Sequence, residues 1–338
     1  MKGFIFSEGN AVPMDKFIGE ALYNKSQGYY MTRAVFGRSG DFITAPEISQ
    51  LFGEIVAVWL LQYLESVKIS EKFALVELGP GRGTMMADIM RVMEKFPEYY
   101  KLIEVYLVEV SPLLRAAQHN VLAEHAKKGK VFWHDNISEL PHCPTIIVAN
   151  EFFDALPLKQ FVLVNGGWRE NYVWCGPEGL RVVQLETEHN LDFDSDLPDG
   201  SVIEKCSAAE DMLCDLENIL VRNGGAGLII DYGYVDPVYK STIQAVKDHR
   251  FCSFLDYVGE CDISACVDFN ALLKALKSIK GEVITQREFL YKFGIRERLE
   301  LLVKNATKEQ EVLLRQSFLR LTENMGTLFK VLLLHHSE

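Results

Sequence analysis

The sequence contains no run of about 18 apolar residues, so it predicts no membrane-spanning helix. Its seven cysteines are odd in number and form no Cys-x-x-Cys pair, which argues against a disulfide framework and against a zinc site. Residues 1–8 lack the apolar segment of a signal peptide, and the N-terminal region is poor in the arginines of a transit peptide. These absences predict a cytoplasmic protein with reduced thiols and no bound metal.

Basic residues are also scarce, because 35 lysines and arginines stand against 47 aspartates and glutamates, for a net charge of −12. Phosphate contacts need clustered positive charge, so nucleic acid is excluded as the main partner. A basic substrate or partner is compatible with this balance. At 338 residues and 48% hydrophobic content, the chain can bury a large core in one or two domains.

The most informative stretch is residues 73–84, an apolar strand that enters a turn containing Gly79, Gly81 and Gly83. Glycine permits positive φ and close approach of backbone amides to a ligand. The spacing matches neither the G-x-G-x-x-G of a dinucleotide site nor the Gly-Lys-Ser/Thr of a phosphate loop. Together with Glu77 it resembles the first motif of the class I S-adenosylmethionine (SAM) methyltransferases. The three glycines would then meet the methionine part of SAM, with Glu77 facing its ammonium group.

Short apolar runs alternate with helical patterns from residue 73 onward. This order predicts an α/β fold with a Rossmann-like parallel sheet covered on both faces. The expected strands are 73–78, 104–109, 130–133, 145–149 and 226–231, and the expected helices are 84–96, 111–126 and 207–223. Two further strand-like runs, about 281–288 and 328–334, close the chain, and the last would be an interior or near-edge strand of the same sheet.

The segments outside this alternation define the remaining parts. Residues 1–70 are expected to form a helical N-terminal cap and cofactor lid, with helices near 13–24 and 46–62. Residues 71–157 would form the cofactor-binding core. Residues 158–206 would insert a β-hairpin lobe that turns at Asn165-Gly166-Gly167. Residues 207–338 would complete the sheet and add one or two amphipathic helices at about 294–320, which face the substrate together with the hairpin.

Acidic residues follow two of the later strands. An acid at the end of the strand after a nucleotide-binding turn can accept both ribose hydroxyls, which makes Glu109 the predicted ribose ligand. Asp135, after the third strand, is the candidate acceptor for the adenine amino group. Trp133 is expected in the core, and His134 is expected to be a polar residue at a strand end.

A third group of polar residues, Asn150, Glu151 and Asp154, follows the fourth strand, where the methyl group of the cofactor should point. Methyl transfer is an in-line displacement, so the enzyme mainly holds a nucleophile close and aligned. If the nucleophile is a guanidinium, carboxylates can orient it and accept the proton that it loses. The alternative is that these acids cap a helix start and hold a loop.

These motifs together resemble the MidA-like, or DUF185, family. The matching stretches are 39–54, 77–84, 150–157, 231–234 and 267–269. The resemblance implies that the N-terminal segment folds over the cofactor, with Asp41, Thr44 and Pro46 near it. Its mitochondrial members are arginine methyltransferases that assist assembly of respiratory complex I. The resemblance therefore implies symmetric dimethylation of an arginine in a protein substrate, such as a respiratory complex subunit.

Two other functions stay open at this point. One is methylation of a small molecule or another nucleophile by the same cofactor. The other is an assembly chaperone that keeps SAM as a structural ligand without turnover. The intact glycine turn, Glu109 and the acids at 150–154 favour catalysis over the chaperone, and the hairpin insert favours a macromolecular substrate over a small one.

Overall fold

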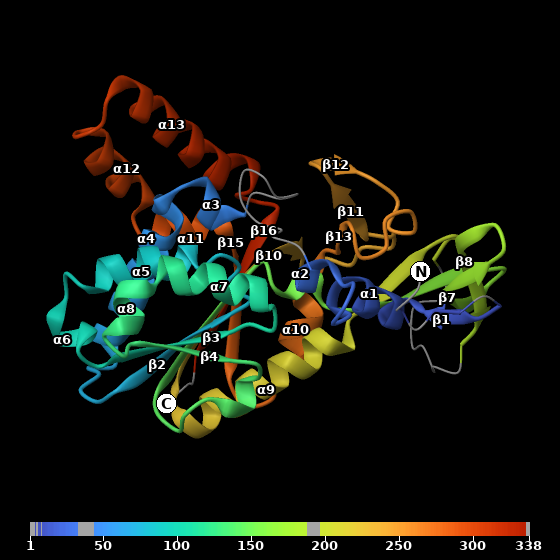
Figure 1. Ribbon diagram of the computed structural model, residues 1–338, viewed down its shortest axis with the longest axis horizontal. Coiled ribbons are helices and arrows are strands. Elements are labelled where there is room, and N and C mark those ends of the chain that lie inside the picture. The colour runs from blue at the N-terminus through green and yellow to red at the C-terminus, as the bar shows by residue number, and fades with distance from the viewer. Residues whose placement is uncertain (1–3, 5, 8, 33–43, 188–196, 336–338) are drawn as a thin grey trace.

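The computed structural model describes the chain except residues 1–3, 5, 8, 33–43, 188–196 and 336–338. Its centre is a mixed sheet with the strand order β15-β16-β10-β5-β2-β3-β4, and β14 pairs with β10 (Figure 1). The strands of this sheet are β2 (Phe73–Leu78), β3 (Ile103–Val108), β4 (Val131–His134), β5 (Thr145–Asn150), β10 (Gly225–Tyr234), β14 (Val267–Asp268), β15 (Lys280–Thr285) and β16 (Phe329–His335).

The predicted parallel sheet is confirmed for β4, β3, β2, β5 and β10, which all run in one direction. The predicted near-edge position of the last strand is also confirmed, since β16 lies between β10 and β15. Its pairing is antiparallel on both sides, so the sheet as a whole is mixed.

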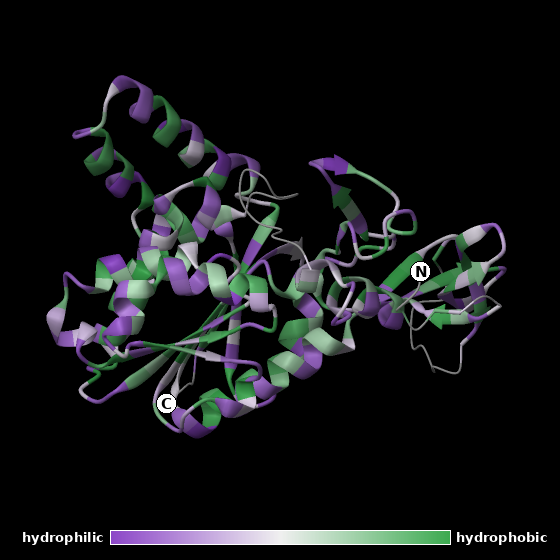
Figure 2. Ribbon diagram, in the orientation of Figure 1, coloured by the Kyte–Doolittle hydropathy of each residue, from purple (hydrophilic) through white to green (hydrophobic). Residues whose placement is uncertain are grey.

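Alternate strand residues build two apolar cores on opposite faces of the sheet. On one face Leu75 and Val148 pack in one cluster with α4 (Gln50–Ser66) and α5 (Thr84–Met93). That cluster also includes residues of α11 (Gln286–Lys292) and α12 (Ile295–Val303). On the other face Val76 and Ile147 pack with α9 (Ser207–Asn223) and α10 (Phe269–Ala275). Figure 2 shows the central strands largely coloured as hydrophobic, as a sheet covered on both faces requires.

Side chains at the N-termini of several helices accept backbone hydrogen bonds and so fix where these helices begin. Ser111 accepts a hydrogen bond from the backbone N–H of Leu114 at 3.4 Å, and Pro112 occupies the first position of α7 (Pro112–Val121). Thr307 forms a capping box with Gln310 at the start of α13 (Lys308–Leu319). The helices predicted at 294–320 are therefore two, α12 and α13.

The shorter helical segments are α6 (Pro97–Tyr100), α8 (Ala123–Lys127), η1 (Ile137–Glu139), η2 (Phe153–Ala155) and the π-helical turn η3 (Arg320–Asn324).

The helix predicted at 46–62 is interrupted. It consists of α3 (Ala45–Ile48) and α4, separated by Ser49 in an extended conformation with φ −166° and ψ 143°. The Ser49 hydroxyl accepts a hydrogen bond from the backbone N–H of Leu51 at 3.2 Å, which starts the second helix. The chain thus changes direction beside the glycine turn before it enters the core.

A second sheet carries the predicted hairpin. Its strands are β1 (Ala11–Pro13), β6 (Lys159–Val164), β7 (Gly167–Gly176), β8 (Gly179–Glu186) and β9 (Val202–Lys205). Val164 pairs with Gly167, so Asn165 and Gly166 form the turn, both with positive φ. The expectation that residues 1–70 are helical is wrong at β1, which pairs with β7.

A third, small sheet was not predicted. It contains β11 (Gln244–Lys247), β12 (Arg250–Phe251) and β13 (Asp262–Ser264). Together with α1 (Met14–Tyr23) and the second sheet it encloses an apolar cluster that includes Phe17, Val173 and Ile263. With α2 (Tyr29–Thr32), these elements lie beside the carboxyl ends of the central strands, on the right in Figure 1.

Candidate cofactor and methyl-transfer site

A cavity of about 700 Å³ lies at the carboxyl ends of β2, β3 and β5. Its wall combines the glycine turn with the residues that follow β3 and β5, and α1 and α2 contribute Tyr23 and Tyr30. A narrower pocket lies on the other side of the glycine turn, where Thr44 and Pro46 face Glu77 and Asn150. Ligands in open α/β sheets bind at this edge, and the larger volume is typical of a small-molecule site.

The glycine turn requires glycine for conformational reasons. Gly79, Gly81 and Gly83 all have positive φ, at 58°, 52° and 81°. A Cβ atom on Gly79 would lie 2.7 Å from the ring of Phe152. Gly83 is the N-cap of α5, so the turn leads directly into the first backbone amides of that helix. The three glycines thereby leave the backbone of this turn open to close approach by a ligand.

Two buried side-chain oxygens beside this turn have no hydrogen-bond partner among the residues that the structure describes. They are Oε2 of Glu77, which is 2% exposed, and Oδ1 of Asn150, which is 8% exposed. Burial and the nearby charge of Glu109 raise the pKa of Glu77 well above its usual value. Buried acceptors are normally satisfied, so this pair fits a ligand that brings hydrogen-bond donors, such as an ammonium group.

Glu109 follows β3 and is buried at 7% exposure. It accepts hydrogen bonds from the backbone N–H of Ser111 at 2.8 Å and from Nε2 of Gln118 at 3.3 Å. Burial raises the pKa of Glu109, and these donors partly oppose the rise. Each carboxylate oxygen keeps a further lone pair, so Glu109 can still accept two hydroxyl groups from the cavity.

Gln118 is a site residue that the sequence analysis missed. Its side-chain amide is fully buried and donates to the carbonyl of Gly81 at 2.7 Å as well as to Glu109. Its oxygen accepts from Nε1 of Trp133 at 3.0 Å, which holds that half-buried ring beside the core. The available signal was a polar residue between Leu114 and Leu122 on the buried face of a predicted helix.

Asp135 lies at the rim of the cavity. Its side chain is 74% exposed and forms an ion pair with Arg115, whose Nε also donates to the backbone carbonyl of Glu109 at 2.7 Å. Asp135 is therefore connected through Arg115 to Glu109, the predicted ribose ligand. The imidazole of His134 faces Glu139 at 3.1 Å, in agreement with its expected character as a polar strand-end residue.

Glu151 occupies the cavity wall in a strained backbone conformation, with φ of 50°. Its Oε1 accepts hydrogen bonds from the backbone N–H of Ala45 at 2.9 Å and from Nδ2 of Asn150 at 3.1 Å. Burial raises the pKa of Glu151 to about 7, although both donors favour the ionised form. A carboxyl group poised near neutral pH at a cavity wall is a candidate acid–base group.

Asp154 is turned away from Glu151. Its side chain lines a neighbouring cavity, while the aromatic pair Phe152 and Phe153 separates the two acids along the chain. Burial above all, and then the nearby charge of Asp231, raises the pKa of Asp154 well above its usual value. The structure therefore brings Asn150 and Glu151 together beside the glycine turn and places Asp154 in the neighbouring cavity.

Asp231 holds the turn that carries these residues. It is completely buried within β10 and accepts hydrogen bonds from the backbone N–H groups of Phe153 at 2.9 Å, Asp154 at 3.1 Å and Tyr232 at 2.9 Å. The alternative interpretation of Glu151 and Asp154 was that they hold this loop. In the structure, Asp231 performs much of that role. Tyr23 adds a bond from its hydroxyl to the carbonyl of Ala155 at 3.0 Å.

The N-terminal segment reaches the site through α3. Thr44 and Pro46 lie beside the glycine turn, whereas Asp41 lies outside the described residues. Glu47 was not predicted as a site residue, yet its Oε1 accepts from Oγ1 of Thr84 at 2.6 Å and its Oε2 lies 3.6 Å from Nη1 of Arg82. The segment is therefore tied to the glycine turn as well as to Glu151.

Known proteins are similar to this chain in sequence. A model of S-adenosyl-L-methionine-dependent methyltransferases, Methyltransf_28, matches residues 55–286. A Drosophila melanogaster protein named protein arginine methyltransferase NDUFAF7 homolog, mitochondrial, is 34% identical over 98% of this chain and 83% of its own length. The human protein arginine methyltransferase NDUFAF7, mitochondrial, is 32% identical over 91% of this chain and 75% of its own.

A solved structure is also similar to this chain. It is a COG1565 superfamily member from Burkholderia thailandensis, described as a likely methyl transferase and bound to S-adenosyl-homocysteine. The match has a TM-score of 0.84 and 26% identity, and it covers 97% of this chain and 88% of that protein. The buried acceptors without a partner, Glu77 Oε2 and Asn150 Oδ1, and the glycine turn fit such a ligand. Among the described residues, no helix is long and apolar enough to cross a bilayer.

One expectation is corrected by these relatives. The cytoplasmic location expected from the sequence is wrong, because the fly and human relatives are both named as mitochondrial proteins. The enzyme class and the cofactor expected from the glycine turn are confirmed. The chain belongs to the Methyltransf_28 (DUF185, MidA-like) family and is a SAM-dependent methyltransferase.

Proposed function

We propose that the chain methylates an arginine side chain of a protein substrate. The observation that carries this proposal is Glu151, a carboxyl group with a pKa of about 7 that is fixed by Ala45 at the wall of the cofactor cavity. The relatives named as protein arginine methyltransferases support the same acceptor. We further propose that this protein substrate is a subunit of a respiratory complex, as the family resemblance implies.

The cofactor would lie along the edge of the sheet. Its ammonium would meet the unpartnered oxygens of Glu77 and Asn150, and its ribose hydroxyls would meet Glu109. Apolar side chains of Val110 and Ile137, with Asp135 at the rim, would enclose the adenine. SAM would supply a methyl group on a positively charged sulfur, and this orientation would turn that group toward Glu151.

Glu151 would act on the acceptor in its ionised form. A guanidinium has a pKa above about 12, so it arrives charged and must lose a proton as it is methylated. An ionised carboxylate can orient the guanidinium and accept that proton. The positive charges of the SAM sulfonium and of the acceptor guanidinium would also lower the pKa of Glu151 from its raised value. The ionised form would thereby be favoured.

The decisive experiment compares methylarginine in mitochondrial proteins of cells with and without the gene, by mass spectrometry. A dimethylarginine that disappears on deletion should return with the wild-type gene and not with Glu151→Gln. Glu98→Gln, on the exposed side of α6, is the matched control and should restore it. If no methylarginine changes while another methylated product disappears, the arginine acceptor is refuted.

A further inference from the structure

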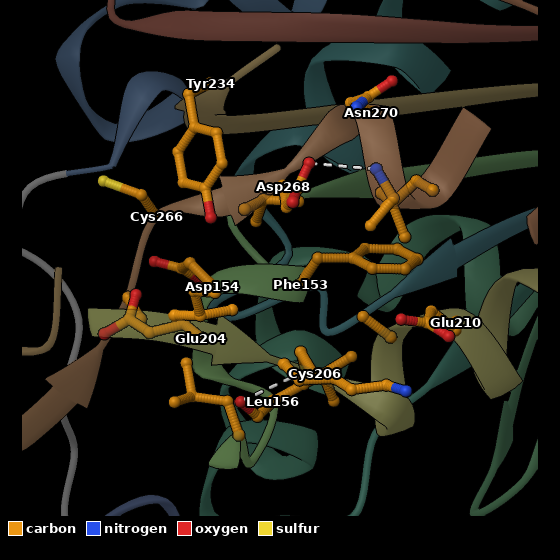
Figure 3. Close-up of a pocket in the computed structure, with 18 of the residues that line it drawn as sticks. Phe153, Asp154, Leu156, Glu204, Cys206, Glu210, Tyr234, Cys266, Asp268 and Asn270 are labelled. Atoms are coloured by element: carbon orange, nitrogen blue, oxygen red, sulfur yellow. Dashed lines mark hydrogen bonds between the residues drawn. The ribbon is translucent and has the colours of Figure 1, made fainter. Parts of the chain in front are cut away.

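A second cavity, of about 250 Å³, lies behind the turn that carries Glu151. It is bounded by β9, α9, α10 and the end of β10, and its walls are largely apolar, with Leu156, Leu158, Ile203 and Leu272 among them. Figure 3 shows Asp154, Glu204 and Tyr234 toward one end of this cavity and Glu210 toward the other.

The charged groups of the cavity are mainly acidic. Four carboxyl side chains line it, and the two lysines that also border it, Lys205 and Lys274, are exposed. The acids outnumber the lysines, and a cation bound among them would favour the ionised forms of Asp154 and Asp268, whose pKa values burial raises. The four acids are Asp154, Glu204, Glu210 and Asp268.

Two of these acids are fixed by the fold. Glu204 accepts hydrogen bonds from Nε2 of Gln160 at 2.7 Å and from the backbone N–H of Thr242 at 2.9 Å. Asp268 caps α10 by accepting from the backbone N–H of Ala271 at 2.9 Å. Carboxyl groups held in this way keep their position when a ligand enters, which reduces the entropic cost of binding.

Only one short turn of the chain separates the second cavity from the cofactor cavity. Phe152 lines the cofactor cavity, Phe153 and Asp154 line the second cavity, and Leu156 borders both. A group bound in the second cavity would therefore be a close neighbour of an acceptor beside Glu151. The complementary ligand is a cation on an aliphatic stem, because the stem would cover apolar walls while the charge meets the acids.

We propose that the second cavity binds another basic side chain of the protein substrate, a lysine or arginine close in sequence to the methylated arginine. This inference rests on the proposed function, because it takes the substrate to be a polypeptide. It also agrees with the net charge of −12, which favours approach of a basic polypeptide. The substrate would then be recognised by two positive charges, one in each cavity.

The test uses synthetic peptides that contain one arginine and one lysine placed one to four residues away on either side. Each peptide is matched with one in which norleucine replaces lysine, so that the stem remains and the charge is lost. We expect kcat/KM for methyl transfer, or the binding constant from fluorescence anisotropy, to favour lysine by about fivefold at one or more spacings, as for a partly buried ion pair.

Glu210→Gln should reduce this lysine preference by at least half, and Ala271→Leu, which fills the cavity from α10, should do the same. Asp211→Asn is the matched control, since Asp211 is exposed on the same helix outside the cavity and should leave the preference unchanged. Equal use of lysine and norleucine peptides at every spacing, or a preference that Glu210→Gln leaves intact, would overturn the inference.

The same data separate this inference from the proposed function. If peptides are methylated on arginine without a lysine preference, the function stands and the second subsite is wrong. If no peptide is methylated but lysine peptides bind better in a Glu210-dependent way, the subsite stands and the arginine acceptor is wrong. If binding and methylation both lack a lysine preference, the subsite is refuted whatever the reaction proves to be.

Discussion

Replacing Glu151 by glutamine should stabilise the protein increasingly as the pH rises. The pKa of Glu151 is raised from 4.5 to about 7 in the folded protein. Between these two values the native state keeps a proton that the unfolded chain has lost, so wild-type stability falls as the pH increases. At about 1.4 kcal/mol for each pKa unit, the variant should gain about 2.5 kcal/mol relative to wild type between pH 5 and pH 8.

Glutamine is a suitable probe because its oxygen can still accept the bonds from Ala45 and Asn150. The assay is thermal unfolding without cofactor at several pH values, where the gain corresponds to about 4 °C in Tm for a chain of this size. Glu98→Gln on the exposed side of α6 is the control. A variant that is less stable by the same amount at every pH would show that Glu151 is not desolvated, and the acid–base argument would fail.

Three further predictions concern the cofactor and the N-terminal segment. Glu109→Ala should weaken SAM binding by about 1–3 kcal/mol in calorimetry, because a buried charged acceptor is lost, and unchanged affinity would contradict the ribose assignment. Asn150→Ala should weaken binding of S-adenosyl-homocysteine but not of methylthioadenosine, which lacks the amino-acid end, and equal losses for both would place Asn150 elsewhere. Amide exchange in residues 44–48 should slow when SAM is added, since α3 lies over the glycine turn, and unchanged protection with saturating SAM would contradict a lid.

The central sheet could be predicted because each strand is a short apolar run bounded by polar turns. The strand bounds agree within one or two residues for β2, β3, β4 and β5. The two missed features depend on contacts distant in sequence. β1 has three residues and acquires strand geometry by pairing with Tyr172–Trp174, and the strands of the third sheet have four residues or fewer. Such segments carry too little periodic pattern to identify a strand.

The candidate site could also be predicted in part from the sequence. Residues at the carboxyl ends of parallel strands meet at one edge, so the topology alone places Glu77, Glu109 and Asn150 around the glycine turn. Gln118 and Glu47 were missed because their roles depend on which tertiary neighbours they reach, Gly81 in one case and Thr84 in the other. Sequence spacing also could not show on which side of the turn each acid would point.

The direction of those acids follows from the anchoring of a single turn. Asp231 accepts the backbone N–H groups of Phe153 and Asp154, which fixes the second half of the turn against β10. Ala45 holds the side chain of Glu151 at the other half, and the residue adopts a positive φ between these two restraints. One turn therefore builds both the wall that faces the cofactor and the wall that faces the second cavity. Because the two walls share a rigid backbone, a substrate bound in the second cavity would be positioned directly relative to Glu151, and specificity and methyl transfer would depend on the same few hydrogen bonds.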